Sequence, residues 1–163
     1  MIAGPPELPA GCEQCAIRTP FDLIPPEQYR LLLDDYYVRS FEDELRMLEK
    51  VADFRRRNPE AFGKVMPHFK RVEASRDPHV LRLLADGVPY AQIELPPEPP
   101  LQLESPGPDD AEVIDYLKHN SFDLDGRMGF VKEQLAVRRP NVRPVTCSQC
   151  RQGWLHLIDP HAI

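Results

Sequence analysis

The sequence predicts a mainly α fold in which a helical bundle is closed by a four-cysteine zinc ribbon assembled from both chain termini. Apolar residues recur at helical spacing through much of the 163-residue chain, and several of its 19 prolines stand where helices begin. All four cysteines lie in two Cys-x-x-Cys pairs, one near each end. A chain of this length forms one domain, or one domain with a small appendage.

We expect five parts along the chain, which differ in composition and in their structural signals. The two ends form the ribbon, and helical segments separated by a proline-rich strap lie between them. The parts are the N-terminal half of the zinc ribbon at 1–24, the helical bundle at 25–94, the strap at 95–108, two further helices at 109–140 and the C-terminal half of the ribbon at 141–163.

Proline and capping signals define the first two helices. We expect one helix over 26–38, because Pro26 presets the helical φ of a first turn. We expect a separate helix over 40–57, because Ser40 and Asp43 can cap each other's backbone N–H groups in a capping box. Together these signals predict a joint between the two helices.

Two more helices are expected before the strap. An Asn-Pro pair at 58–59 starts a helix at once, and Pro67 within it predicts a kink or a break near Met66. An Asp-Pro pair at 77–78 starts a short helix that ends at Gly87. The apolar residues expected to be buried on this short helix are Val80, Leu81, Leu83 and Leu84.

The chain then becomes irregular. Residues 88–93 suit a short strand or an irregular edge. From 95 to 108 the prolines exclude a helix or a central strand, so this segment is predicted to be an extended, semi-rigid polyproline connector. The prolines are Pro96, Pro97, Pro99, Pro100, Pro106 and Pro108.

Two further helices follow the strap. Asp109 and Glu112 form another capping box, which predicts a helix that ends near His119. Asp125 is expected to cap the last helix, which ends before Pro140.

The cysteine pairs predict one metal site. Two residues between ligands let a single tight turn direct both sulfurs at one ion, and structural zinc favours four thiolates. The 131 residues between the two pairs far exceed the usual gap of about 15–20. Residues 154–158 are expected as the returning strand of a hairpin after the second pair. The predicted ligands are Cys12, Cys15, Cys147 and Cys150.

Other interpretations of the same cysteines remain open. They are a single iron at the same four ligands, a redox-active pair, two separate sites, or disulfides. Many zinc-binding turns carry glycine directly after the second cysteine, whereas this chain has Ala16 and Arg151 there.

The charge balance bears on nucleic acid. A net charge of -6 argues against a protein that binds nucleic acid over its whole surface, but it allows a local basic patch. Such a patch could bind phosphates and stack a base on tryptophan, although we expect the tryptophan to pack on the hairpin instead. Its candidate residues are Arg138, Arg139, Arg143, Arg151 and Trp154.

Three functions are compatible with these features. The first is a non-enzymatic, zinc-stabilised interaction protein, either an adaptor or a structural subunit of a larger assembly with protein partners. The second is a zinc-ribbon regulator that binds nucleic acid in transcription or RNA handling. The third is an enzyme whose site is not visible in sequence, since no Gly-rich phosphate loop, Gly-x-Ser-x-Gly or zincin helix occurs.

Two expectations accompany the first hypothesis. We expect a cytoplasmic protein without membrane contact, because neither a signal peptide nor a long apolar run is present. An exposed apolar patch would support a docking function. The candidate patches are Tyr29 with Tyr36 and Tyr37, or Leu101 with Leu103.

Overall fold

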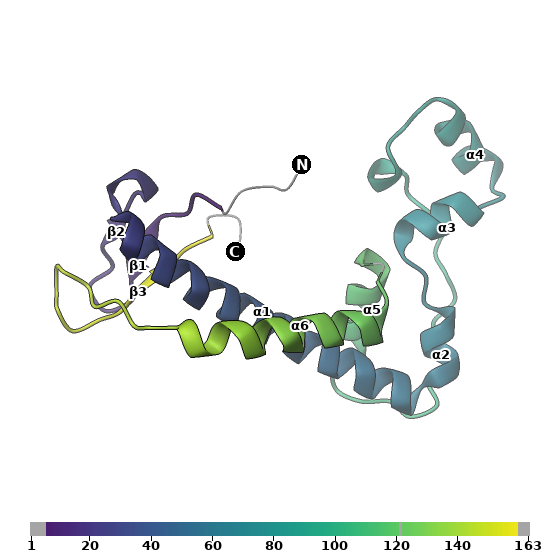
Figure 1. Cartoon of the computed structure of the whole chain (residues 1–163). Helices are drawn as coiled ribbons and strands as arrows, with labels where there is room; N and C mark the ends of the chain where they lie inside the picture. The colour runs from purple at the N-terminus through teal and green to yellow at the C-terminus, as the bar shows by residue number, and fades with distance from the viewer. Residues whose placement is uncertain (1–5, 121, 160–163) are drawn as a thin grey trace. The chain divides into compact units, whose positions relative to one another are not determined.

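The computed structural model describes residues 6–120 and 122–159, and in these the chain is mainly helical (Figure 1). A small antiparallel sheet joins strands from near both ends of the chain. The predicted mainly α fold is therefore confirmed. The chain forms two compact units, one of Met1–Leu45 with Met128–Ile163 and the other of Arg46–Arg127. The predicted division into five parts stays a prediction.

Helix α1 (Pro26–Arg57) is one continuous helix of 32 residues, so the predicted joint between 38 and 40 is wrong. Neither proline nor glycine occurs between Glu27 and Arg57. A capping box acts where a helix begins, and nothing in this stretch ends the preceding helix. Ser40 therefore lies inside the helix and caps no end.

In the first unit, the sheet consists of β1 (Ala10–Cys12), β2 (Arg18–Thr19) and β3 (Leu155–Leu157) in the order β2-β1-β3. A short 3-10 turn, η1 (Phe21–Leu23), follows β2. Ala10 lies opposite Leu157 in the register of β1 and β3. One core lies between the sheet and the first turns of α1, and it includes Ile24 after η1 and Val145 before the second cysteine pair. Its buried residues are Ala10, Ile24, Tyr29, Leu32, Val145 and Leu157.

Helix α6 (Leu124–Arg138) continues into η3 (Arg139–Asn141). Two of its residues contact α1 within the first unit: the Phe130 ring meets Phe41 edge-on, and Arg138 lies over the Tyr37 ring at 4.4 Å. Asp125 was expected to cap α6, but it lies in the first turn and binds Arg55 instead.

The second unit contains three short helices, α2 (Pro59–Lys64), α3 (His68–Ala74) and α4 (Pro78–Ala85). The gap between α2 and α3 confirms the break predicted near Met66. The Asp77 side chain accepts the His79 N–H at 2.8 Å and so caps α4 as expected. Leu81 is 49% exposed rather than buried. The small core beside α4 contains Val72, Val80 and Ile93. It buries only one face of the helix, and Leu81 lies outside that face.

The segment before the strap forms a 3-10 turn, η2 (Tyr90–Gln92), and not a strand. After the strap comes α5 (Asp110–His119). The capping box predicted for α5 is wrong, because the Asp109 side chain makes no cap. Lys50 of α1 forms ion pairs with the two residues of that capping box instead: its Nζ lies 3.0 Å from Glu112 and 3.9 Å from Asp109.

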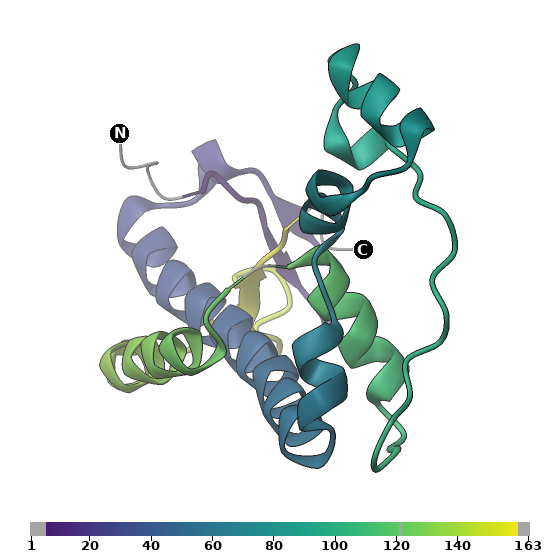
Figure 2. The same ribbon diagram turned by 90° about the vertical axis from the view of Figure 1, so that its right-hand side faces the viewer.

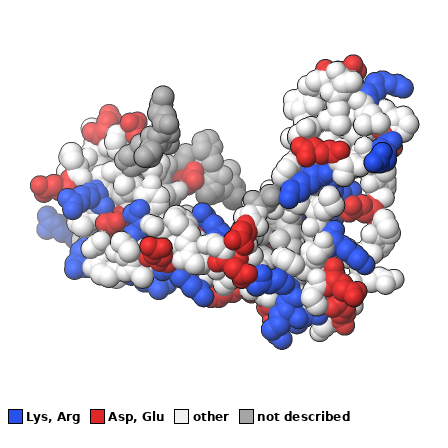
Figure 3. All heavy atoms as spheres, turned by 45° about the vertical axis from the view of Figure 1, so that its right-hand side comes forward, with Lys and Arg blue, Asp and Glu red and all other residues white. Residues whose placement is uncertain are grey.

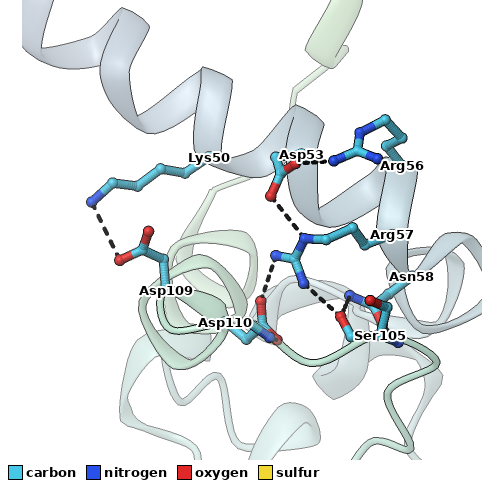
Figure 4. A network of polar contacts seen from close by, with 9 residues as sticks. Lys50, Asp53, Arg56, Arg57, Asn58, Ser105, Asp109 and Asp110 are labelled. Carbon is cyan, nitrogen blue, oxygen red and sulfur yellow. Dashed lines mark hydrogen bonds and ion pairs between the residues drawn. The ribbon is translucent and has the colours of Figure 1, made fainter.

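A polar network fixes the end of the strap to the joint between α1 and α2 (Figure 4). Asn58 is fully buried; its amide oxygen accepts the Ser105 N–H at 2.8 Å and its amide nitrogen donates to the Ser105 carbonyl at 3.1 Å. Arg57 donates to Asp110 at 2.9 Å and to Asp53 at 2.8 Å. The Arg57 guanidinium beside Asp110 lowers the pKa of that carboxyl. The network thus satisfies every side-chain polar group that it buries among the described residues.

No helix within 6–120 and 122–159 is both long enough and apolar enough to span a membrane.

We predict that Asn58→Ala lowers the free energy of unfolding by about 1–3 kcal/mol, because it removes both hydrogen bonds to the Ser105 backbone. Urea unfolding followed by circular dichroism measures the change. Gln102→Ala is the control, since Gln102 is exposed and its truncation is expected to change stability by less than about 0.5 kcal/mol. Equal effects of the two substitutions would contradict the structural role of Asn58.

Candidate metal centre

The two cysteine pairs lie in turns of the same construction. The Ala16 N–H donates to the Cys12 carbonyl, and the Arg151 N–H donates to the Cys147 carbonyl, both at 2.9 Å. Ala16 has φ +59° and Arg151 has φ +57°, so both residues adopt the left-handed conformation. These are the positions at which many zinc-binding turns carry glycine, which adopts this conformation without steric cost. The two turns therefore have the backbone conformation of such zinc-binding turns, although Ala16 and Arg151 replace the usual glycines.

The sheet sets the two turns side by side in the first unit. Cys12 ends β1 and lies opposite Leu155 of β3. On the C-terminal side, Thr146 bridges Trp154, and the Leu155 N–H donates to the Val145 carbonyl at 2.8 Å. The predicted hairpin is therefore confirmed, and its returning strand also pairs with β1.

The four sulfurs lie close together. All four Sγ atoms are within 4.8 Å of one another. The Sγ atoms of Cys12 and Cys150 are 3.8 Å apart, and those of Cys15 and Cys147 are 3.7 Å apart. Tetrahedral zinc with Zn–S bonds of about 2.3 Å requires sulfurs about 3.8 Å apart. The residues present therefore fit one tetrahedral ion with two ligands from each end of the chain.

Backbone N–H groups and neighbouring thiols shift the pKa values of these cysteines in different directions. The N–H groups of Gln152 and Gly153 lower the pKa of Cys150 to about 6, and the Cys150 N–H lowers that of Cys147. For Cys15, the Ile17 N–H lowers the pKa, but burial and the other three thiols together raise it to about 11. The cysteines of the cluster therefore differ in how readily they lose a proton.

Gly153 allows the two turns to approach. A Cβ at this position would lie 2.6 Å from the Cβ of Gln14 and would overlap the Cys12 Sγ. Its N–H also points to the Cys150 sulfur at 3.4 Å. The sequence alone does not reveal this role, because a glycine three residues after a cysteine does not show which distant residues it contacts.

The predicted basic patch is only partly assembled for binding. Arg138 is 3.3 Å from Asp34 and Arg139 is 3.3 Å from Glu42, so both guanidinium groups are paired with carboxylates of α1. Arg143 donates to the backbone carbonyls of Pro140 and Val142. The face drawn in Figure 3 carries basic and acidic side chains intermixed.

Two members of that set remain at the surface of the C-terminal turn. Arg151 is exposed, and Trp154 is 58% exposed, so the expected packing of Trp154 on the hairpin is wrong. Trp154 pairs with Thr146 across the hairpin, and more than half of its side chain stays open to solvent.

The predicted tyrosine patch is also wrong in part. Tyr29 is buried, because it belongs to the core beneath the sheet and its hydroxyl bonds to the backbone of Pro6 and Leu8. Tyr36 and Tyr37 are half-buried. Leu101 and Leu103, in the other candidate patch, are half-buried as well.

A second polar feature lies beside the first turn. His156 of β3 is 2.9 Å from the Asp35 carboxylate of α1, and it lines a cavity of about 430 Å³ together with Arg39 and Asp159. The described residues that line this cavity include no serine, threonine or tyrosine hydroxyl. The pair therefore ties β3 to α1, and the thiol that lines the same cavity, Cys12, belongs to the four-cysteine cluster.

No protein-family model, curated protein or solved structure matches this chain. Its own residues define it as a mainly helical protein with a four-thiol cluster drawn from both ends.

We predict that Ala16→Gly and Arg151→Gly each raise the free energy of unfolding by about 1 kcal/mol, because glycine relieves the strain of a positive φ. Chemical denaturation of the metal-loaded protein measures this. The control is Ala136→Gly at an exposed position inside α6, which is expected to lower stability by about 1 kcal/mol. Destabilisation by all three substitutions would refute the left-handed geometry of the turns.

We also predict that Gly153→Ala weakens metal binding at least about tenfold, a loss of roughly 1.4 kcal/mol, since its methyl group would push the turns apart. Competition with a chromogenic chelator reports the affinity. Gly63→Ala is the matched control, because a Cβ there meets nothing within 4 Å. An unchanged affinity in Gly153→Ala would show that the turns do not need this close approach.

Proposed function

We propose that the four cysteines bind one structural zinc ion that joins the two ends of the chain, and that the protein is a non-enzymatic interaction protein, either an adaptor or a structural subunit of a larger assembly. The separations of 3.7 and 3.8 Å between sulfurs of opposite turns carry the first part of this proposal. Four thiolates fill a tetrahedral ion and leave no position for a substrate. The ion would therefore hold the fold together and take no part in a reaction.

Zinc is favoured over iron and over redox chemistry for separate reasons. Tetrahedral sulfur sites suit both metals, but an iron centre of this kind transfers electrons, and the sequence carries no second electron-carrying motif. A redox-active Cys-x-x-Cys opens a helix. Here both pairs lie in turns beside short strands. In addition, each pair places both of its sulfurs within 3.8 Å of a sulfur of the other pair.

Zinc can supply the energy that this closure requires. The length-dependent cost of closing a loop of 131 residues is about 4 kcal/mol, because it grows with the logarithm of the length. Structural zinc contributes on the order of 10 kcal/mol or more at neutral pH. The ion therefore outweighs the chain entropy lost by joining such distant segments.

Two observations support an interaction function over catalysis. The charged side chains of the network in Figure 4 pair with one another around the strap and leave no isolated acid or base in it. The strap itself is exposed over several consecutive residues. An enzyme with scattered residues stays the weakest of the three hypotheses.

One observation favours nucleic-acid binding as a second candidate. Trp154 and Arg151 are both exposed at the C-terminal turn, where an indole could stack on a base and a guanidinium could contact phosphate. Fluorescence titration of Trp154 with single-stranded oligonucleotides tests this. Salt-sensitive quenching that Arg151→Ala reduces would favour it, and no quenching at low salt would remove it.

We predict that the purified protein binds one zinc ion per chain and that uptake at pH 7 releases at least one proton. The Cys15 thiol, with a pKa of about 11, is protonated at this pH and must lose its proton to bind as thiolate. Elemental analysis gives the stoichiometry, and calorimetry in buffers of different ionisation enthalpy gives the proton count.

Cys15→Ser and Ser148→Ala form the matched pair for this experiment. The first removes a ligand and is expected to lose most zinc binding, whereas the second changes an exposed residue between two ligands. Less than half a zinc ion per chain, or full binding by Cys15→Ser, would disprove the proposed site.

A further inference from the structure

The strap contains a symmetric proline sequence. Residues 95–101 read Leu-Pro-Pro-Glu-Pro-Pro-Leu, and no helix or strand is formed between η2 and α5. Proline restricts its own φ to about -65° and drives the residue before it into the extended region. Four of these seven residues are prolines and four precede one, so a polyproline II conformation is dictated by local sterics. Figure 2 shows the segment as a long extended stretch leading into α5.

Both ends of this segment are anchored in the second unit. On the N-terminal side, Ile93 is 1% exposed in the core with Val72 and Val80, and Leu95 packs against that core. On the C-terminal side, Ser105 is held by Asn58. The Glu104 carboxylate accepts the backbone N–H groups of the first turn of α2 at 3.1 and 3.3 Å. The segment is therefore held extended between two fixed points.

Between the anchors the proline rings are open to solvent. All four prolines of 95–101 are exposed, while Leu95 and Leu101 at its ends are half-buried. In the middle of the segment, Glu98 forms an ion pair with Arg71 at 2.7 Å. On its inner side the segment borders a hollow of about 660 Å³ that His68 and Lys118 also line. A partner can therefore reach more than one side of the extended segment 95–101.

Exposed prolines in this form match the ligands of aromatic grooves. Proline-recognition domains bind polyproline II segments in grooves lined by aromatic side chains and gain from the low entropy of the preformed helix. Anchoring at both ends removes more of the ordering cost of binding.

The charge of the segment restricts the partner further. Glu94 is exposed, and no lysine or arginine occurs between residues 94 and 105. Glu98 is paired with Arg71 and Glu104 with the backbone of α2, so Glu94 carries the acidic charge that a partner meets. Complementarity then requires a basic rim on the partner's groove.

We propose that residues 95–101 are a preformed polyproline II ligand that docks into the aromatic groove, with a basic rim, of a separate proline-recognition domain. This inference rests on the proposed interaction function and names the class of its partner. The four exposed prolines would contact the aromatic side chains, and Glu94 would face the basic rim.

The test uses the full-length, zinc-loaded protein and a panel of purified SH3, WW and EVH1 domains, which includes members with lysine or arginine at the groove rim. Calorimetry is expected to detect binding by domains with a basic rim, with affinity that decreases as salt is raised. Replacing Pro96, Pro97, Pro99 and Pro100 together by alanine is expected to weaken binding at least tenfold. Pro106→Ala with Pro108→Ala is the control, because these exposed prolines lie outside the segment, and it should leave the affinity unchanged.

A second variant separates preorganisation from contact. Asn58→Ala removes the Ser105 part of the C-terminal anchor but keeps the Glu104 contacts and all prolines, and it is expected to weaken binding several-fold. Zinc content and thermal unfolding of each variant verify that it is folded. The proposal is overturned if no domain of the panel binds, or if the four-proline variant binds like the control.

The two proposals fail in different ways. One zinc ion per chain without domain binding would overturn only the assignment of the segment. Domain binding by a protein that takes up no zinc would overturn only the metal site.

Discussion

The pairing of β1 with β3 is the contact on which the first unit depends. It joins residues near opposite ends of the sequence, and it places the sulfurs of Cys12 and Cys150 3.8 Å apart. Two three-residue strands supply too few hydrogen bonds to hold such distant segments alone. An ion that binds two cysteines from each end would add the missing stabilisation, and the core beneath the sheet, which contains Tyr29, would then form around chain ends that are already joined.

In the second unit, polar side chains hold an irregular segment in place. Its extended strap has no strand to pair with, so its backbone polar groups need other partners. The buried Asn58 amide satisfies both backbone groups of Ser105, and Arg57 links Asp53 to Asp110 close by. In each unit, then, a few polar groups of fixed geometry hold an irregular segment. Because the strap is held at its two ends, the proline rings between these anchors stay exposed.

Local signals predicted local features well. The cysteine spacing predicted the two turns and their joining, and Pro67 predicted the break between α2 and α3. Two of the errors arose where a distant residue competed with a local signal. Lys50 binds the carboxylates that would have formed a capping box at α5, and Arg55 binds Asp125 of α6 at 2.8 Å. Such pairs are set by the tertiary fold, so no pattern within a single helix could have revealed them.

We propose that one zinc ion binds four thiolates drawn from both ends of the chain. X-ray absorption at the zinc edge of the purified protein tests it most directly. We expect a first shell of four sulfur atoms at about 2.3 Å with no nitrogen or oxygen ligand. A shell containing nitrogen or oxygen, or fewer than four sulfurs, would contradict the account.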